Sequence, residues 1–187
     1  LDLSPEGHQP MHSADGRYII VFNGEIYNHR QLRKELENST YVNNSSNINW
    51  RGHSDTEVML AAIMQWGLIE AIQRFTGMFA FALWDRKKKK LYLVRDRIGE
   101  KPLYYGWSNE TFLFGSELKA LRAYPGWRDE IDREALALYM QFNYVPAPNT
   151  IYKGIRKLEP GCIAKITGNG SSHDVEIQKY WSMHDVV

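Results

Sequence analysis

The chain has 187 residues, of which 43% are hydrophobic and 24% charged, so it can form one domain with an ordinary core. Its 23 lysine and arginine residues nearly balance its 22 aspartate and glutamate residues. This balance argues against a surface built to hold nucleic acid or an acidic membrane, and no apolar run reaches membrane-spanning length.

The first predicted elements are a strand and a helix. Residues 18–22 are all apolar or aromatic and predict a buried strand. Asn23, Gly24 and Glu25 follow, and Asn-Gly is a dipeptide typical of hairpin turns. A helical pattern comes next instead of a second strand, with Asn28 as its predicted N-cap. The residues Asn-Gly-Glu are therefore expected at the junction of a strand and a helix.

Two helices and a hairpin are predicted in the middle of the chain. Ser54 and Glu57 form a capping-box pattern that begins a helix, Gly67 can end it, and residues 68–75 predict a second, short helix. Residues 78–84 and 91–94 predict the two strands of a hairpin. Lysines 87–90 lie between them, and we interpret this run as a solvated turn and not as a nucleic-acid patch.

The remaining segments complete an α+β pattern. They comprise a hairpin within 103–116, helices at 117–123 and at 133–142 with Asp132 as cap, an irregular segment at 144–161 with three prolines, and strands at 163–166 and 175–180 around a turn at 168–172. Antiparallel hairpins mixed with grouped helices favour α+β layers over alternating βαβ units.

Metal and nucleophile motifs are sparse. The histidines have no metal-ligand spacing, and we interpret them as surface or packing residues (His8, His12, His29 and His53 among them). Cys162 is the single cysteine, which excludes an intrachain disulfide and suits a reducing cytoplasm. We expect it to be an ordinary buried thiol. No secretory leader pattern, nucleophile elbow or phosphate-binding loop is present.

Two groups of polar residues suggest chemistry. The side-chain amide of Asn23 and the backbone N–H of Gly24 could together stabilise an oxyanion. The carboxylates of Glu25 and Asp55 could hold an ammonium group. Each group also has a structural explanation, because Asn-Gly is common in turns and an aspartate in the first turn of a helix favours the helix dipole.

Six blocks, in order, resemble the glutamine-hydrolysing domain of glutamine-dependent asparagine synthetases. The blocks are FNGEIYN, GHSDTE, GMFAFALWD, RDRIGEKPLYY, FGSELKAL and YVPAPNTIYKGIRKLEPG, and the resemblance runs from Asp2 to about Trp181. It implies a class II (N-terminal-nucleophile) glutamine amidotransferase fold, a four-layer αββα sandwich, here truncated at its N-terminus. Residues 1–160 would form the partial amidotransferase domain, and 161–187 its last strands and the start of a linker.

The resemblance also implies roles for four residues. Asn23 and Gly24 would form the oxyanion hole, and Glu25 and Asp55 would hold the amino-acid end of the substrate L-glutamine. No metal is implied. The family's nucleophile, a cysteine at the mature N-terminus, and an arginine shortly before the DLSPxGHQPM block have no counterpart in the chain. We therefore expect a fragment that carries half of a glutaminase site and is inactive alone.

The resemblance implies a larger parent enzyme. Ammonia from glutamine would pass to a synthetase domain of the same polypeptide, which would use ATP and magnesium to amidate aspartate, with no cofactor in the present domain. The parent could be a homodimer. Two alternatives stay open: a paralogue that amidates another acid in polysaccharide or secondary-metabolite synthesis, and a non-catalytic remnant that serves as a binding or scaffold module.

Overall fold

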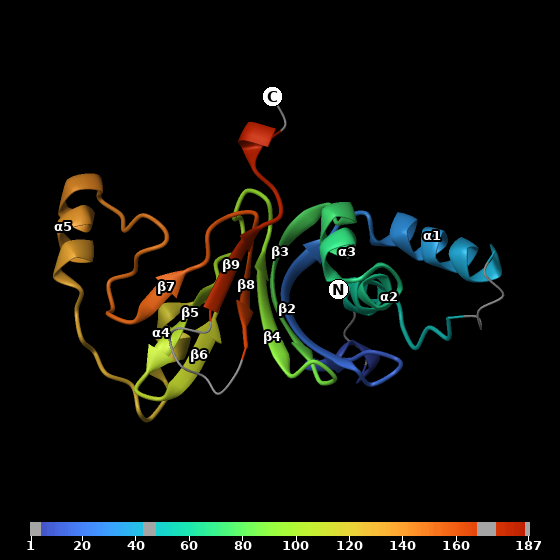
Figure 1. Ribbon diagram of the computed structural model, residues 1–187, viewed down its shortest axis with the longest axis horizontal. Coiled ribbons are helices and arrows are strands. Elements are labelled where there is room, and N and C mark those ends of the chain that lie inside the picture. The colour runs from blue at the N-terminus through green and yellow to red at the C-terminus, as the bar shows by residue number, and fades with distance from the viewer. Residues whose placement is uncertain (1–4, 43–47, 168–174, 186–187) are drawn as a thin grey trace.

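The computed structural model describes residues 5–42, 48–167 and 175–185, and it shows two antiparallel sheets that face each other between helices (Figure 1). The large sheet has six strands in the order β1-β2-β3-β4-β8-β9, and the small sheet has three in the order β6-β5-β7. The strands are β1 (Met11–His12), β2 (Tyr18–Ile26), β3 (Gly77–Asp85), β4 (Lys90–Arg95), β5 (Tyr104–Ser108), β6 (Thr111–Gly115), β7 (Ile155–Lys157), β8 (Cys162–Ile166) and β9 (Val175–Lys179).

Helices lie on the outer side of each sheet (Figure 1). The large sheet carries α1 (His29–Val42), α2 (Asp55–Trp66) and α3 (Leu68–Arg74), and α4 (Leu118–Arg122) and α5 (Arg133–Phe142) lie beyond the small sheet. Two short 3₁₀ helices, η1 (Pro5–Gly7) and η2 (Met183–Asp185), lie near the ends of the described chain. The predicted four-layer αββα arrangement is confirmed.

Two cores hold three of these layers together, namely the helices α1 to α3 and the two sheets. The first lies between the helices α1 to α3 and the large sheet, and its largest fully buried side chains include Phe75, Phe79 and Phe81. The second lies between the two sheets and contains Leu93, Tyr105 and other small or apolar residues. Because side chains alternate along a strand, one strand can serve both cores: Phe79 and Phe81 face the helices, whereas Ala80 and Ala82 face the small sheet.

The predicted junction at Asn23-Gly24-Glu25 is wrong, because β2 runs on to Ile26. All nine residues of β2 pair in register with β3, from Tyr18 opposite Asp85 to Ile26 opposite Gly77. The local turn preference of Asn-Gly is thus overridden by pairing with a strand more than fifty residues away. Helix α1 begins only at His29, three residues after the strand ends.

Most other predicted elements are confirmed. The hairpins β3–β4 and β5–β6, the helices α2 to α5 and the strands β8 and β9 lie within a few residues of their predicted bounds. The Oγ of Ser54 accepts a hydrogen bond from the N–H of Glu57, and the carboxylate of Asp132 accepts from two N–H groups of α5. The predicted turn at 168–172 lies outside the described residues.

Two local predictions are wrong. The side chain of Asn28 does not cap α1; its amide donates to the carbonyl of Arg74 and its oxygen accepts from the N–H of Thr76, which ties the start of α1 to the end of α3. The segment 144–161 is not wholly irregular, since residues 155–157 form β7 and pair with β5. Strand β1, with two residues, was not predicted at all.

The lysine run and Cys162 match their predictions. The chain turns between β3 and β4, and the side chains of lysines 87–89 are exposed there. Cys162 is buried in the core between the sheets. Within the described part of the chain, no helix combines the length and apolar character that crossing a bilayer requires.

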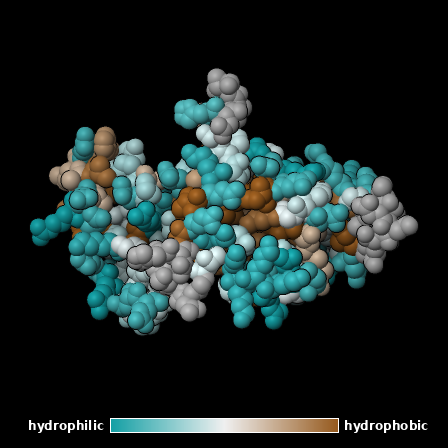
Figure 2. Space-filling model, in the orientation of Figure 1, coloured by the Kyte–Doolittle hydropathy of each residue, from teal (hydrophilic) through white to brown (hydrophobic). Residues whose placement is uncertain are grey.

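Helix α5 is the most weakly covered helix of the fold. Of its ten residues only Ala135 is buried, whereas Leu136, Tyr139, Met140 and Phe142 are each more than two-fifths exposed. Hydrophobic atoms accordingly reach the surface at the α5 end of the molecule (Figure 2).

A buried ion pair at the start of β2 should make the fold acid-sensitive. The Asp85 carboxylate accepts two hydrogen bonds from the Arg17 guanidinium and two from backbone N–H groups. Burial alone raises the pKa of Asp85, but the hydrogen bonds from Arg17 and the backbone outweigh it and lower the pKa below its usual value. Stability gained from a lowered carboxylate pKa is present above the unfolded-state pKa and is lost as the pH falls.

We expect the free energy of unfolding to fall as the pH drops below about 4, the pKa of aspartate in an unfolded chain. Asp85→Asn should lower the stability at neutral pH and flatten this acid dependence. Denaturant titrations from neutral to acidic pH measure both effects, with Glu110→Gln, in an exposed turn, as control. An unchanged acid dependence in Asp85→Asn would contradict the assignment.

Candidate functional site

The outer edge of β2 presents a row of backbone groups. On this edge the carbonyl of Tyr18 accepts from the N–H of Ser13, and the N–H of Phe22 donates to the Oε1 of Gln9. The N–H of Ile26 donates to the Oδ2 of Asp55. Since every second residue of an antiparallel strand points its backbone to the same side, the N–H of Gly24 also points to this edge. It has no hydrogen-bond partner among the described residues.

The hydrogen bonds of β3, the strand paired with the inner edge of β2, confirm the direction of the Gly24 N–H. The N–H and the carbonyl of Phe79, opposite Gly24, both bond to Asp96 and so point away from β2. Gly24 and Phe79 are therefore a close, non-hydrogen-bonded pair. A Cβ at Gly24 would lie 2.1 Å from the carbonyl oxygen of Met78 and 2.7 Å from the Cα of Phe79, so only glycine fits.

The Asn23 side chain projects from the opposite face to the buried Ile26, toward the small sheet. It is exposed, and its Nδ2 donates to the Oγ of Ser116, 2.9 Å away, just after β6. A carboxamide carries two N–H donors, so one remains for a ligand. The serine contact fixes the amide of Asn23, the residue next to Gly24 in β2.

Asp55 brings the start of α2 to the end of β2. Its two carboxylate oxygens accept from the N–H groups of Ile26 and Thr56, both at 2.9 Å. The carboxylate is half-buried and keeps further acceptor positions. Glu25, next to Ile26 in the chain, is exposed. The structure thus brings all four predicted site residues, Asn23, Gly24, Glu25 and Asp55, together at one end of β2.

Negative charge gathers at this end of the strand. Desolvation raises the pKa of the Tyr27 phenol, and the carboxylates of Glu100, Glu25 and Asp96 raise it further, in that order. With Asp55, these carboxylates favour a ligand that carries a positive charge.

The loop after β4 is built around one buried carboxylate. Asp96 is 1% exposed, and its oxygens accept from five backbone N–H groups, those of Phe79, Ile98, Gly99, Glu100 and Lys101. The neighbouring Arg95 donates to the carbonyl oxygens of Gly99, Lys101 and Leu158. This network places Glu100 near the end of β2.

Three residues that support the site were not predicted: Gln9, Ser116 and Asp96. Gln9 and Ser116 contact β2 from bends 13 and 93 residues away in the chain; Ser116 lies within the block FGSELKAL, but a single glutamine or serine gives no local signal. Asp96 lies within a block that carries the resemblance, and an aspartate followed by a glycine-containing loop is a weak sign of a carboxylate that accepts backbone N–H groups.

Two other candidate groups, Cys162 and His29, have structural surroundings. Burial raises the pKa of the Cys162 thiol, which therefore stays protonated at neutral pH. The Nδ1 of His29 is 2.9 Å from the carbonyl oxygen of Ile26 and so has a structural contact. In residues 5–42, 48–167 and 175–185 no three His, Cys, Asp or Glu side chains are grouped so as to hold a metal ion.

Comparisons with known proteins identify relatives of the chain. The model of the glutamine amidotransferase domain family matches residues 1–181, which include β8 and β9. The boundary between the amidotransferase domain and a linker segment, which the sequence analysis places after residue 160, stays a prediction. Asparagine synthetase [glutamine-hydrolyzing] 1 of Bacillus subtilis is 41% identical over 94% of the chain, and a putative asparagine synthetase [glutamine-hydrolyzing] of Mycobacterium tuberculosis is 40% identical over 89%. The chain spans about a quarter of the length of these relatives, 26% and 25%.

Two solved structures share the fold. One is described as the allosteric regulatory enzyme of purine biosynthesis, with a TM-score of 0.63 and 19% identity over 95% of this chain and 32% of that one. The other is glutamine phosphoribosylpyrophosphate amidotransferase from B. subtilis, with a TM-score of 0.59 and 20% identity over the same shares. At these identities the likeness concerns the fold alone.

Proposed function

Because the chain belongs to the glutamine amidotransferase domain family, we propose that it forms the glutamine site of an asparagine synthetase that takes its nitrogen from glutamine. The observation that carries the proposal is the free N–H of Gly24 at the open edge of β2, beside the held amide of Asn23. Two fixed donors at one point are what the oxyanion of a tetrahedral intermediate needs.

The chemistry divides among the four residues. A cysteine thiolate, which another part of the longer protein must supply, attacks the side-chain carbonyl of glutamine, and Asn23 and Gly24 meet the negative charge that develops on the carbonyl oxygen. Ammonia leaves, and water then releases glutamate from the thioester. Glu25 and Asp55 bind the ammonium group of the substrate and fix its position. Cys162 does not supply the thiolate, since it is buried and its pKa is raised.

The remaining steps belong to other parts of a longer protein. We propose that the ammonia reaches a synthetase domain that binds ATP and magnesium and amidates aspartate, and that this protein acts in the cytoplasm and assembles as a homodimer. The relatives support the first point, since they are about four times as long as the chain and are named asparagine synthetases. A paralogue with another acceptor, or a non-catalytic remnant, would fail the test below.

The test uses the full-length protein with amide-labelled glutamine. We expect release of glutamate and transfer of the label to the side chain of aspartate when ATP and magnesium are present. Glutamate release with transfer to a different acid would support the paralogue. If no glutamate is released under any condition, the site is not a glutaminase.

Asp55→Asn should raise the KM for glutamine by about tenfold, because it removes a charge that contacts the substrate in the ground state and in the transition state alike. Steady-state kinetics with glutamine measure this, and the reaction with free ammonia should be unaffected. Glu70→Gln is the control, since Glu70 forms an exposed pair with Arg74 on α3. If Asp55→Asn also abolished the ammonia-dependent reaction, Asp55 would have a structural role.

A further inference from the structure

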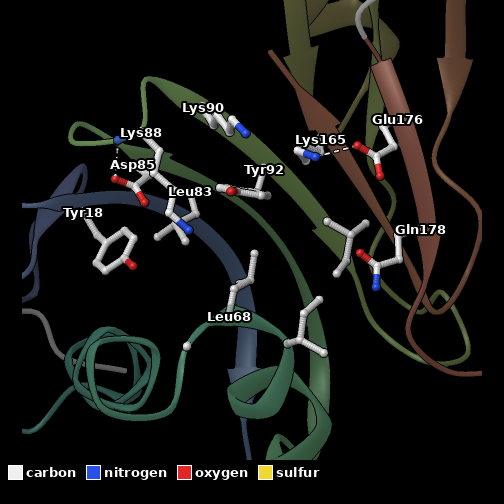
Figure 3. A pocket seen from close by; sticks show the side chains of 13 residues that line it. Tyr18, Leu68, Leu83, Asp85, Lys88, Lys90, Tyr92, Lys165, Glu176 and Gln178 are labelled. Atoms are coloured by element: carbon white, nitrogen blue, oxygen red, sulfur yellow. Dashed lines mark hydrogen bonds and ion pairs between the residues drawn. The ribbon is translucent and has the colours of Figure 1, made fainter.

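A hollow of about 360 Å³ lies on the helix-facing side of the large sheet, between the start of α3 and the strands β4, β8 and β9 (Figure 3). Its floor lies over Leu83 and Ile163 of the sheet, which are 0% and 2% exposed, and Leu68 and Ile69 of α3 form an accessible apolar wall. Tyr18 and Tyr92 stand over this floor, and Lys88 and Lys90 lie at the rim. We call this hollow the tyrosine–lysine pocket.

Strand pairing explains why these side chains share one face. Leu83 lies opposite Tyr92, Tyr92 opposite Lys165, and Lys165 opposite Glu176, so the four form one row across the sheet. Ile163 pairs with Gln178 in a neighbouring row. The helices cover β2 and β3, but beyond α3 they leave the side chains of these two rows on β4, β8 and β9 uncovered (Figure 3).

The two carboxylates of the pocket are already neutralised. Asp85 is paired with Arg17 at 2.7 Å, and its side chain is only 2% exposed. Glu176 is paired with Lys165, and a hydrogen bond from that lysine lowers the pKa of Glu176 more than the nearby charge of Lys90 does. Among the described residues, the ammonium groups of Lys88 and Lys90 form no ion pair, so the pocket keeps an excess of positive charge.

The two phenols are free donors. Neither the hydroxyl of Tyr18 nor that of Tyr92 has a hydrogen-bond partner among the described residues, and neither is sealed from solvent. Burial raises the pKa of both phenols, so at neutral pH both keep the proton that they can donate. An apolar floor, two phenolic donors and two unpaired cations match an amphipathic anion.

We infer that the tyrosine–lysine pocket is a second binding site, which takes a small organic anion with an apolar body about the size of a ring. The anionic group bonds to the phenols and to Lys90, and the ring rests against Leu68 and Ile69 of α3. The site is separate from the glutamine site: Tyr18 and Gly24 are six residues apart on β2, which corresponds to roughly 20 Å at the rise of a strand.

The test compares two probes that differ in charge alone. Indole-3-carboxylate and indole-3-carboxamide are titrated into the full-length protein by ligand-observed NMR, at low and at high salt. We expect the carboxylate to bind about tenfold tighter than the carboxamide and to lose this advantage at high salt. Equal binding of the two probes, or no binding in the millimolar range, would overturn the inference.

Three variants locate the binding. Lys90→Gln should remove most of the difference between the two probes, and Tyr92→Phe should weaken the carboxylate several-fold while keeping the ring in place. Lys87→Gln is the matched control, since Lys87 lies on the same turn but does not line the pocket. If Lys87→Gln weakened the carboxylate as much as Lys90→Gln, the attraction would be general surface charge and the inference would be wrong.

Discussion

Asn23→Ala should lower the kcat of glutamine hydrolysis by about two to three orders of magnitude and change KM little. Removing one donor from an oxyanion hole costs about 3 to 4 kcal/mol of transition-state stabilisation. The Asn23 amide is aimed at a charge that exists only after attack on the carbonyl, so its loss falls on the chemical step and not on binding.

Ser116→Ala separates positioning from catalysis in the same experiment. It frees the Asn23 amide, which now donates to the Oγ of Ser116 at 2.9 Å, but keeps the donor itself. We therefore expect a smaller loss of kcat than in Asn23→Ala. Both variants should retain the ammonia-dependent reaction of the full-length protein, which does not use this site. If Asn23→Ala left glutamine turnover intact, the oxyanion assignment would be wrong.

Local sequence signals were sufficient to predict most helices and strands. The two hairpins have apolar runs on both sides of short polar turns, and the helices α2 and α5 begin at residues whose side chains accept from the next turn, Ser54 and Asp132. These features depend on neighbours within a few positions, so the sequence alone reveals them. The resemblance added the layer order, which no local pattern contains.

Long-range contacts account for what was missed. Strand β7 has three residues and exists because β5, about fifty residues earlier, offers its free edge. Asn28 is a good cap by composition, but its side chain is used instead to join α1 to the segment between α3 and β3. In both cases the deciding partner is distant in sequence, so propensity alone gave the wrong answer.

In the candidate site, too, residue types could be predicted from the sequence, whereas features that depend on long-range contacts could not. The chemistry of Asn23, Gly24, Glu25 and Asp55 could be predicted from residue types and from the resemblance. Their geometry could not, because it depends on β2 continuing past the Asn-Gly dipeptide and on Asp55 reaching the N–H of Ile26. An unpaired N–H inside a strand, rather than one in a turn, gives the donor a rigid position.

Gly24→Ala should be strongly destabilising, since it acts on the pairing of β2 with β3. The new Cβ would lie 2.1 Å from the carbonyl oxygen of Met78, which belongs to the backbone of β3 and cannot turn away as a flexible side chain can. Neither strand can move without breaking its register. We expect a loss of about 3 kcal/mol or more in the free energy of unfolding, at the upper end of overpacking effects.

Denaturant unfolding of Gly24→Ala against Gly16→Ala isolates the clash. Gly16 also has a positive φ, +69°, but nothing lies within 4 Å of a Cβ built there. That variant should lose only about 1 kcal/mol, the cost of the left-handed conformation. Equal losses in the two variants would mean that β2 can separate from β3 at Gly24, and the N–H of Gly24 would then lack the fixed direction that an oxyanion donor requires. A much larger loss in Gly24→Ala would show that the close contact between β2 and β3 fixes the direction of the N–H of Gly24.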